Sequence, residues 1–134
     1  MPHKLAELGT YEEWLRRAKS NLALARVQKT EDICWEDLCF ETQQAAEKAI
    51  KAVLIHNNIQ FRFVHDIAEL LTLLEQNNIQ FPEEVRAAAE LTDYAVEARY
   101  PGPFEAVSEE EFLRAFKIAA TVVSWAESQA SKLR

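Results

Sequence analysis

The sequence predicts an all-α domain, an antiparallel bundle of about five helices. Nearly half of the 134 residues are hydrophobic (49%), whereas only 2 are Gly and 4 are Pro, a balance that suits helices better than a many-turned β fold. Apolar residues recur at helical spacing through most of the chain. Helix-capping signals stand where these patterns begin and end. One domain is expected to span residues 1–134, a length that buries a sizeable core.

The first helix is expected from Tyr11 to Gln28, because Thr10 followed by Glu13 is a capping box. Apolar residues then recur along one face, at Trp14, Leu15, Ala18, Leu22 and Ala25. The polar stretch from Lys29 to Asp32 interrupts the pattern, and a second helix is expected from Trp35 to Asn57. Small residues gathered on this helix would let a neighbouring helix approach closely: Ala45, Ala46, Ala49 and Ala52.

The pentapeptide Asn-Asn-Ile-Gln-Phe occurs twice, at residues 57–61 and 77–81. Asn tolerates the left-handed conformation that ends helices, and the following Ile can fold back on the last turn. The repeat therefore predicts two helix stops with a third helix between them, from His65 to Gln76. A fourth helix is expected from Glu83 to Ala98, and a fifth from Glu109 to Leu133. Ser108 and Glu111 form a second capping box in front of the fifth.

Charge and hydropathy exclude several classes of protein. A net charge of −7 argues against general nucleic-acid binding, which needs a basic surface. No apolar run approaches the roughly 20 residues of a membrane span. The sequence also starts without the apolar core of a secretion signal, so a cytoplasmic location is expected. Cys34 and Cys39 lack metal-site spacing and the three His are scattered, so no metal site is predicted.

Three segments carry a resemblance to a known family. They are Gln-Ala-Ala-Glu-Lys-Ala-Ile-Lys-Ala-Val-Leu at residues 44–54, His65-Asp66, and Arg99-Tyr100-Pro101. In order and spacing they resemble the HEPN family, the "higher eukaryotes and prokaryotes nucleotide-binding" domain. The resemblance implies a helical bundle that is often encoded beside a minimal nucleotidyltransferase. It also implies that some relatives are metal-independent ribonucleases in toxin–antitoxin pairs.

In those relatives the nuclease activity depends on an Arg followed, after four to six residues, by a His. No Arg of this sequence has a His at that distance. Lys51 and His56 have the separation, but a Lys ammonium does not clamp phosphate oxygens as a planar guanidinium does. No catalytic residue and no cofactor are therefore predicted, and the chain is expected not to be an enzyme.

A local basic cluster predicts a nucleotide- or partner-binding site. Lys48 and Lys51 lie on the second helix, and Arg62 and His65 flank the start of the third, where free N–H groups favour an anion. The resemblance adds Arg99 and Tyr100, which it places near a groove for a ligand or partner. We expect one groove to be lined by Lys48, Lys51, Arg62, His65 and Arg99.

A purely structural interpretation of the same residues stays open. Glu47 and Lys51 would form an ordinary surface pair one helical turn apart, Lys48 would be solvated, and Asp66 would cap the third helix. His65 would then cap that helix or donate a hydrogen bond to a neighbouring one.

Three hypotheses about function follow. The first is a non-catalytic HEPN domain that binds a nucleotide or serves as the accessory partner of a minimal nucleotidyltransferase, in a toxin–antitoxin-like pair. The second is a ligand-free dimerisation module, in which helix two and Trp14, Trp35 and Trp125 would form a homodimer interface. The third, a divergent ribonuclease toxin, is disfavoured by the missing Arg/His spacing.

Overall fold

The computed structural model describes residues 8–95 and 106–131. These residues form five α-helices and one 3-10 helix, without a strand among them. The helices are α1 (Tyr11–Ala25), α2 (Trp35–His56), α3 (Ile67–Gln76), α4 (Glu83–Arg86), the 3-10 helix η2 (Ala87–Ala95) and α5 (Glu109–Ser131). The predicted all-α fold is confirmed.

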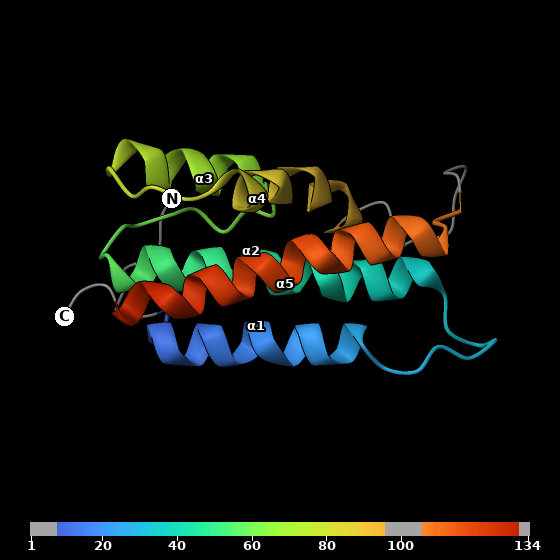
Figure 1. Cartoon of the computed structure of the whole chain (residues 1–134). Coiled ribbons are helices and arrows are strands. Elements are labelled where there is room, and N and C mark those ends of the chain that lie inside the picture. Colours follow the sequence, from blue (N-terminus) through green and yellow to red (C-terminus); the bar gives the residue numbers. More distant parts are fainter. Residues whose placement is uncertain (1–7, 96–105, 132–134) are drawn as a thin grey trace.

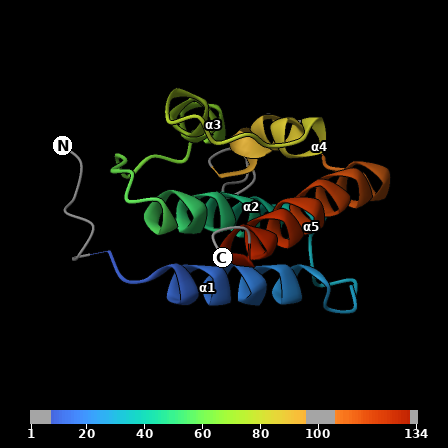
Figure 2. The same ribbon diagram turned by 60° about the vertical axis from the view of Figure 1, so that its left-hand side comes forward.

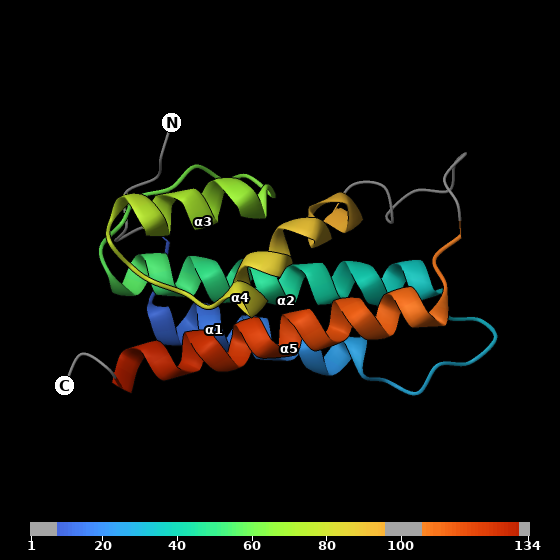
Figure 3. The same cartoon turned by 45° about the horizontal axis from the view of Figure 1, so that its top comes forward.

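Helix α2 is the centre of the bundle, and its most extensive contacts are with α1 and α5. In Figure 1, α2 and α5 lie next to one another between α1 on one side and α3 with α4 on the other. Figures 2 and 3 show the same arrangement from two further directions, with α3 and α4 lying on the side of α2 away from α1. A residue on α2 can therefore face α1, α5, or the layer of α3 and the 3-10 helix.

The alanines of α2 explain how these helices come so close. Ala45, Ala46, Ala49 and Ala52 are completely buried. Ile50 and Leu54, also completely buried, continue the same inner stripe as larger side chains. Small and large residues together let neighbouring helices interlock with α2 at the density of a protein interior.

The capping signals lie where the sequence predicts them. The Thr10 hydroxyl accepts the Glu13 N–H at 3.1 Å, and a Glu13 carboxylate oxygen accepts the Thr10 N–H at 3.0 Å. Both copies of the repeated pentapeptide end a helix: Asn58 has φ +58° and Asn78 has φ +61°. After each, the Ile donates its N–H back to the last turn, as Ile59 does to the carbonyl of Leu54 at 2.9 Å.

Several predicted boundaries need correction. Helix α1 ends at Ala25 and not at Gln28, because the chain leaves helical geometry at its C-cap Arg26 (φ −96°, ψ 2°). Helix α3 begins at Ile67 and not at His65, since the Asp66 carboxylate accepts the Ala68 N–H at 3.0 Å and makes Asp66 the N-cap.

The predicted fourth helix is one α-helical turn followed by a 3-10 helix. Its winding tightens at Ala87, and the Thr92 hydroxyl accepts the Ile67 N–H at 3.1 Å, which ties η2 to the first turn of α3. The predicted end at Ala98 lies outside the described residues.

At the start of the fifth helix, the Ser108 hydroxyl accepts the Glu111 N–H at 3.1 Å, while the Glu111 carboxylate accepts the Tyr94 hydroxyl.

Candidate functional site

Lys51 is buried in the protein, with only 5% of its side chain exposed. Its ammonium lies 2.8 Å from a carboxylate oxygen of Glu47, whose side chain is 3% exposed. The other Glu47 oxygen accepts the Gln43 amide at 2.9 Å and lies 2.9 Å from Nδ1 of His65. The Glu47–Lys51 contact is thus a buried ion pair and not the surface pair of the purely structural interpretation.

Three aromatic rings also lie close to the Lys51 ammonium. The ring centroids of Trp14, Phe61 and Phe63 lie 5.8, 5.6 and 5.5 Å from Nζ. Faces of aromatic rings attract a cation at such distances. The ammonium is therefore held by groups of the protein itself, one carboxylate and three rings.

Burial alone would raise the pKa of Glu47, but attraction to Lys51 and hydrogen bonds from Lys51, Gln43 and His65 outweigh it. The net effect lowers the pKa of this carboxyl, so Glu47 stays charged at neutral pH. Through Glu47, the structure links Lys51 on α2 to His65 in the connection before α3.

Arg62 pairs with Glu69 and not with Glu47, the carboxylate that Lys51 and His65 share. Its guanidinium donates two hydrogen bonds to the Glu69 carboxylate on α3, at 3.2 and 2.6 Å, and 60% of its side chain is exposed. The predicted groove residues Arg99 and Tyr100 lie outside the described residues.

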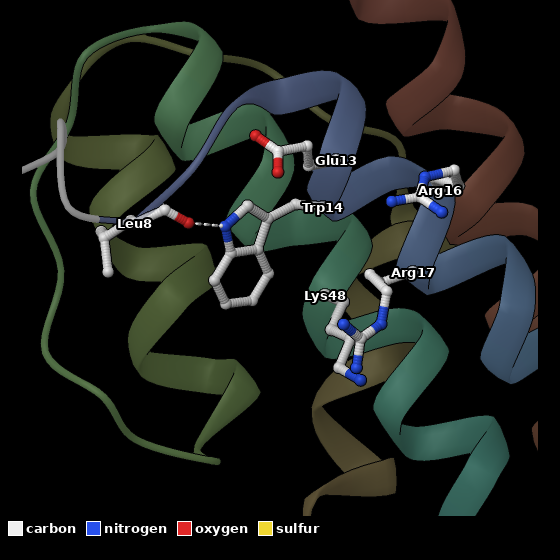
Figure 4. A pocket seen from close by; sticks show the side chains of 6 residues that line it. All are labelled: Leu8, Glu13, Trp14, Arg16, Arg17 and Lys48. Atoms are coloured by element: carbon white, nitrogen blue, oxygen red, sulfur yellow. Dashed lines mark hydrogen bonds between the residues drawn. The ribbon is translucent and has the colours of Figure 1, made fainter.

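Lys48, one of the predicted binding residues, lines a pocket on the α1 side of α2. The cavity has a volume of about 240 Å³. Figure 4 shows its lining residues, which are Leu8, Glu13, Trp14, Arg16, Arg17 and Lys48. We call this cavity the basic pocket.

The Lys48 ammonium donates a hydrogen bond of 2.9 Å to the side-chain oxygen of Asn21, whose amide donates to Glu41 at 2.7 Å. Partial burial lowers the pKa of Lys48, and the nearby Arg17 guanidinium lowers it further. Figure 4 shows the head groups of Arg17 and Lys48 next to each other. Two cations therefore meet in the pocket, and neither has a described carboxylate within ion-pair distance.

Three arginines elsewhere on the described surface differ from those of the pocket, whereas Arg26 makes no ion pair either. Arg62, Arg86 and Arg114 each pair with a Glu. Within residues 8–95 and 106–131, no carboxylate pairs with Arg16 or Arg17.

Glu13, the carboxylate that lines the basic pocket, is occupied elsewhere. One of its oxygens accepts the Thr10 N–H as part of the helix cap, and in Figure 4 its head group points away from the cations. The pocket therefore holds three cationic side chains without an ion-paired carboxylate among the described residues, beside the ring of Trp14.

Sequence reasoning missed Arg16, Arg17 and Trp14 as site residues. A signal for two of them exists, because Trp14, Arg17 and Asn21 are spaced three and four residues apart and so share one helix face. That this face meets Lys48 depends on how α1 packs on α2, which helical spacing does not reveal.

Among the described residues, no group of three or more His, Cys, Asp or Glu is arranged to hold a metal ion. In the same described part of the chain, no helix has the length and apolar character needed to cross a membrane.

The fold and pocket define a compact helical-bundle domain without an assembled metal centre in its described part. The model of the HEPN domain family matches residues 11–129, and the chain belongs to this family.

Two solved structures are similar over nearly the whole chain. ST0689, an archaeal HEPN homologue, is 27% identical, and the match covers 90% of this chain and 98% of that one, with a TM-score of 0.71. TT1696 from Thermus thermophilus is 26% identical, with coverages of 88% and 96% and a TM-score of 0.73. Among proteins with curated descriptions, none matches the chain.

Proposed function

We propose that this chain is a non-catalytic HEPN domain that binds the phosphate groups of a nucleotide and acts as the accessory partner of a minimal nucleotidyltransferase. The family assignment supplies the class of protein. The observation that supports ligand binding is the basic pocket, where Arg16, Arg17 and Lys48 face a cavity without a paired carboxylate. The sequence lacks the Arg/His spacing of the ribonuclease relatives, which supports a non-catalytic role.

The size and lining of the basic pocket suit part of a nucleotide. Its volume of about 240 Å³ lies below the roughly 300–1,000 Å³ of pockets that enclose a whole small molecule. Phosphate oxygens would accept hydrogen bonds from the guanidinium of Arg17 and the ammonium of Lys48. The base would lie outside the cavity, where the Trp14 ring offers a face or edge for contact.

The other predicted binding residues take supporting roles in this proposal. Lys51 and His65 share the Glu47 carboxylate, so they fix the connection before α3 against α2. Arg62, exposed beside Glu69, and Arg99 with Tyr100 remain predicted contacts for the protein partner.

Isothermal titration with ATP tests ligand binding. Arg17→Ala removes a charged donor and is expected to weaken binding about tenfold or more, since a hydrogen bond to a charged group contributes roughly 1.5–3 kcal/mol. Arg26→Ala is the matched control, because Arg26 is an exposed arginine near the other end of the same helix and lies over the Phe116 ring. Equal affinity of wild type and Arg17→Ala would remove the basic pocket as the nucleotide site.

Partner binding is tested with the product of the neighbouring gene. If it is a minimal nucleotidyltransferase, size-exclusion chromatography of the mixture at about 50 µM of each protein should give a complex, because weak specific pairs associate in this range. Two separate peaks would contradict the accessory role. Growth arrest on expression of this chain alone would instead favour the ribonuclease toxin.

A second candidate function, the dimerisation module, is favoured by an exposed apolar surface near the C-terminal end of α1. Leu24, Val27 and Leu113 are 49%, 45% and 55% exposed. Trp125 does not contribute to it, because it is buried in the monomer's core and packs edge-on against Phe81. Sedimentation at low micromolar concentration is the test, and a monomer would exclude the module.

A further inference from the structure

We propose that Lys48 is a site of covalent acylation by small acyl phosphates, with the basic pocket binding the phosphate and Lys48 accepting the acyl group. This inference shares its pocket with the proposed function, but it concerns a chemical reaction of the protein alone. It rests on the placement of an amine beside the unpaired Arg17 guanidinium, in a cavity that Arg16 also lines.

The first requirement is a docked reagent. An acyl phosphate carries a dianionic phosphoryl group joined to a carbonyl carbon. The guanidinium groups of Arg16 and Arg17 match phosphate oxygens in charge and geometry, and they make no ion pair with a described carboxylate. A small molecule such as acetyl phosphate suits a cavity of about 240 Å³ better than a bulky reagent does.

The second requirement is an amine that is free to react. The Lys48 ammonium forms no ion pair with a described residue, and its hydrogen bond goes to the neutral side chain of Asn21. Lys51, three residues on, is the opposite case, because Glu47 holds its ammonium in a buried pair. Lys19 pairs with Glu127 on the surface. Lys48 thus combines partial burial with a neutral partner.

The surroundings favour the neutral amine. Partial burial lowers the pKa of Lys48, and Arg17 and Lys51 lower it further by repulsion, against the opposing attraction of Glu41 and Glu47. A desolvated lysine beside another cation is a recognised way of activating an amine nucleophile. The charged groups that act on Lys48 come from two helices: Arg17 from α1, and Glu41, Glu47 and Lys51 from α2. Glu13 and Arg16, also on α1, line the same cavity.

The reaction is balanced without a further reagent. The lone pair of the neutral Lys48 amine attacks the carbonyl carbon, forming a C–N bond as the C–O bond to phosphate breaks. The phosphate departs with the bonding electrons, held by Arg16 and Arg17, and the nitrogen loses one proton to the phosphate or to water. The products are inorganic phosphate and an amide whose remaining N–H still donates to Asn21. Acylation removes one of three positive charges from the pocket, so anion binding should weaken.

The test is acetylation by acetyl phosphate at pH 8, with each lysine quantified by peptide mass spectrometry. Lys48 should react about fivefold faster or more than Lys117, an exposed lysine on α5. Inorganic phosphate should slow Lys48 selectively. An N-hydroxysuccinimide ester of acetate, which carries no phosphate, should show a smaller preference for Lys48. Because burial and repulsion lower the pKa of Lys48, the initial rate at Lys48 should also level off below the usual lysine pKa of about 10.4.

Two arginine variants separate the pocket from general reactivity. Arg17→Gln should abolish the preference for acetyl phosphate, whereas Arg26→Gln, at the C-cap of the same helix and outside the basic pocket, should retain it. Equal rates at Lys48 and Lys117, or an equal preference with both reagents, would overturn the inference. Failure of ATP to bind, with Lys48 still acetylated selectively, would instead count against the proposed function alone.

Discussion

Removing the Lys51 ammonium should destabilise the fold strongly, because the Glu47 carboxylate would stay buried without an ionic partner. Both side chains are nearly inaccessible, with exposed fractions of 5% and 3%, and their atoms lie 2.8 Å apart. Removing one partner of such a buried pair costs about 3–5 kcal/mol, since the remaining charge loses its compensation. Lys51→Met, which keeps the apolar stem against the aromatic rings, should therefore lower the free energy of unfolding by that amount.

Two comparison variants, measured by urea denaturation at pH 7, separate the cost of the unpaired buried charge from other effects of the Lys51→Met substitution. Arg114→Met breaks the Arg114–Glu90 pair, whose side chains are 66% and 47% exposed, and should cost at most about 1 kcal/mol. The double variant Glu47→Gln/Lys51→Met leaves an acceptor for Gln43 and carries no buried charge. It should recover most of the loss of Lys51→Met. A cost for Lys51→Met no larger than that for Arg114→Met would refute the reasoning.

The pH dependence of the stability gives an independent check on the direction of the Glu47 pKa shift. In the wild type the pKa of Glu47 is lowered on folding, so its stabilising contribution is present above the usual carboxyl pKa of about 4.3 and is lost as pH falls through the folded value. In Lys51→Met, burial without the ammonium should raise the pKa of Glu47 instead. The stability that Lys51→Met loses relative to the wild type should therefore shrink as pH falls from 7 to 4. A loss that stays constant over this range would contradict the buried ion pair.

Two further predictions concern the helices. Ile50→Ala or Leu54→Ala, each at a completely buried position of α2, should cost about 2–5 kcal/mol, whereas Lys48→Ala should cost little; equal small losses in denaturant would show that the buried face is misassigned. Asn58→Ala, at φ +58°, should cost about 1 kcal/mol while Asn58→Gly is tolerated. Thermal unfolding that ranks Asn58→Gly below Asn58→Ala would contradict a left-handed helix stop.

Local signals were enough to predict the number and order of the helices. A capping box or a left-handed Asn acts within one turn, so Thr10 with Glu13 and the two copies of the repeat mark helix ends that the structure confirms. The 3-10 geometry of η2 was not predictable in this way. Its sequence is compatible with an α-helix, and its link to α3 depends on a contact between Thr92 and Ile67, 25 residues apart.

The burial of Lys51 at the candidate site was also not predictable from local sequence patterns. Glu47 and Lys51 have the four-residue spacing of an ordinary surface pair. What encloses the ammonium comes from other parts of the chain, Trp14 on α1 and two Phe in the connection after α2. A helical pattern reports one helix at a time, so it does not reveal which face neighbouring segments cover.

The basic pocket follows from how the carboxylates are distributed and not from a shortage of them. The chain has 22 acidic and 15 basic side chains, enough to pair every cation. Glu13 accepts the Thr10 N–H in the cap of α1, and Glu41 accepts the Asn21 amide. Arg16 and Arg17 are exposed to solvent, and no described carboxylate pairs with either of them. Because the cap that starts α1 also occupies the carboxylate of the pocket, the same few residues that fix the helix leave its cations available to an anion.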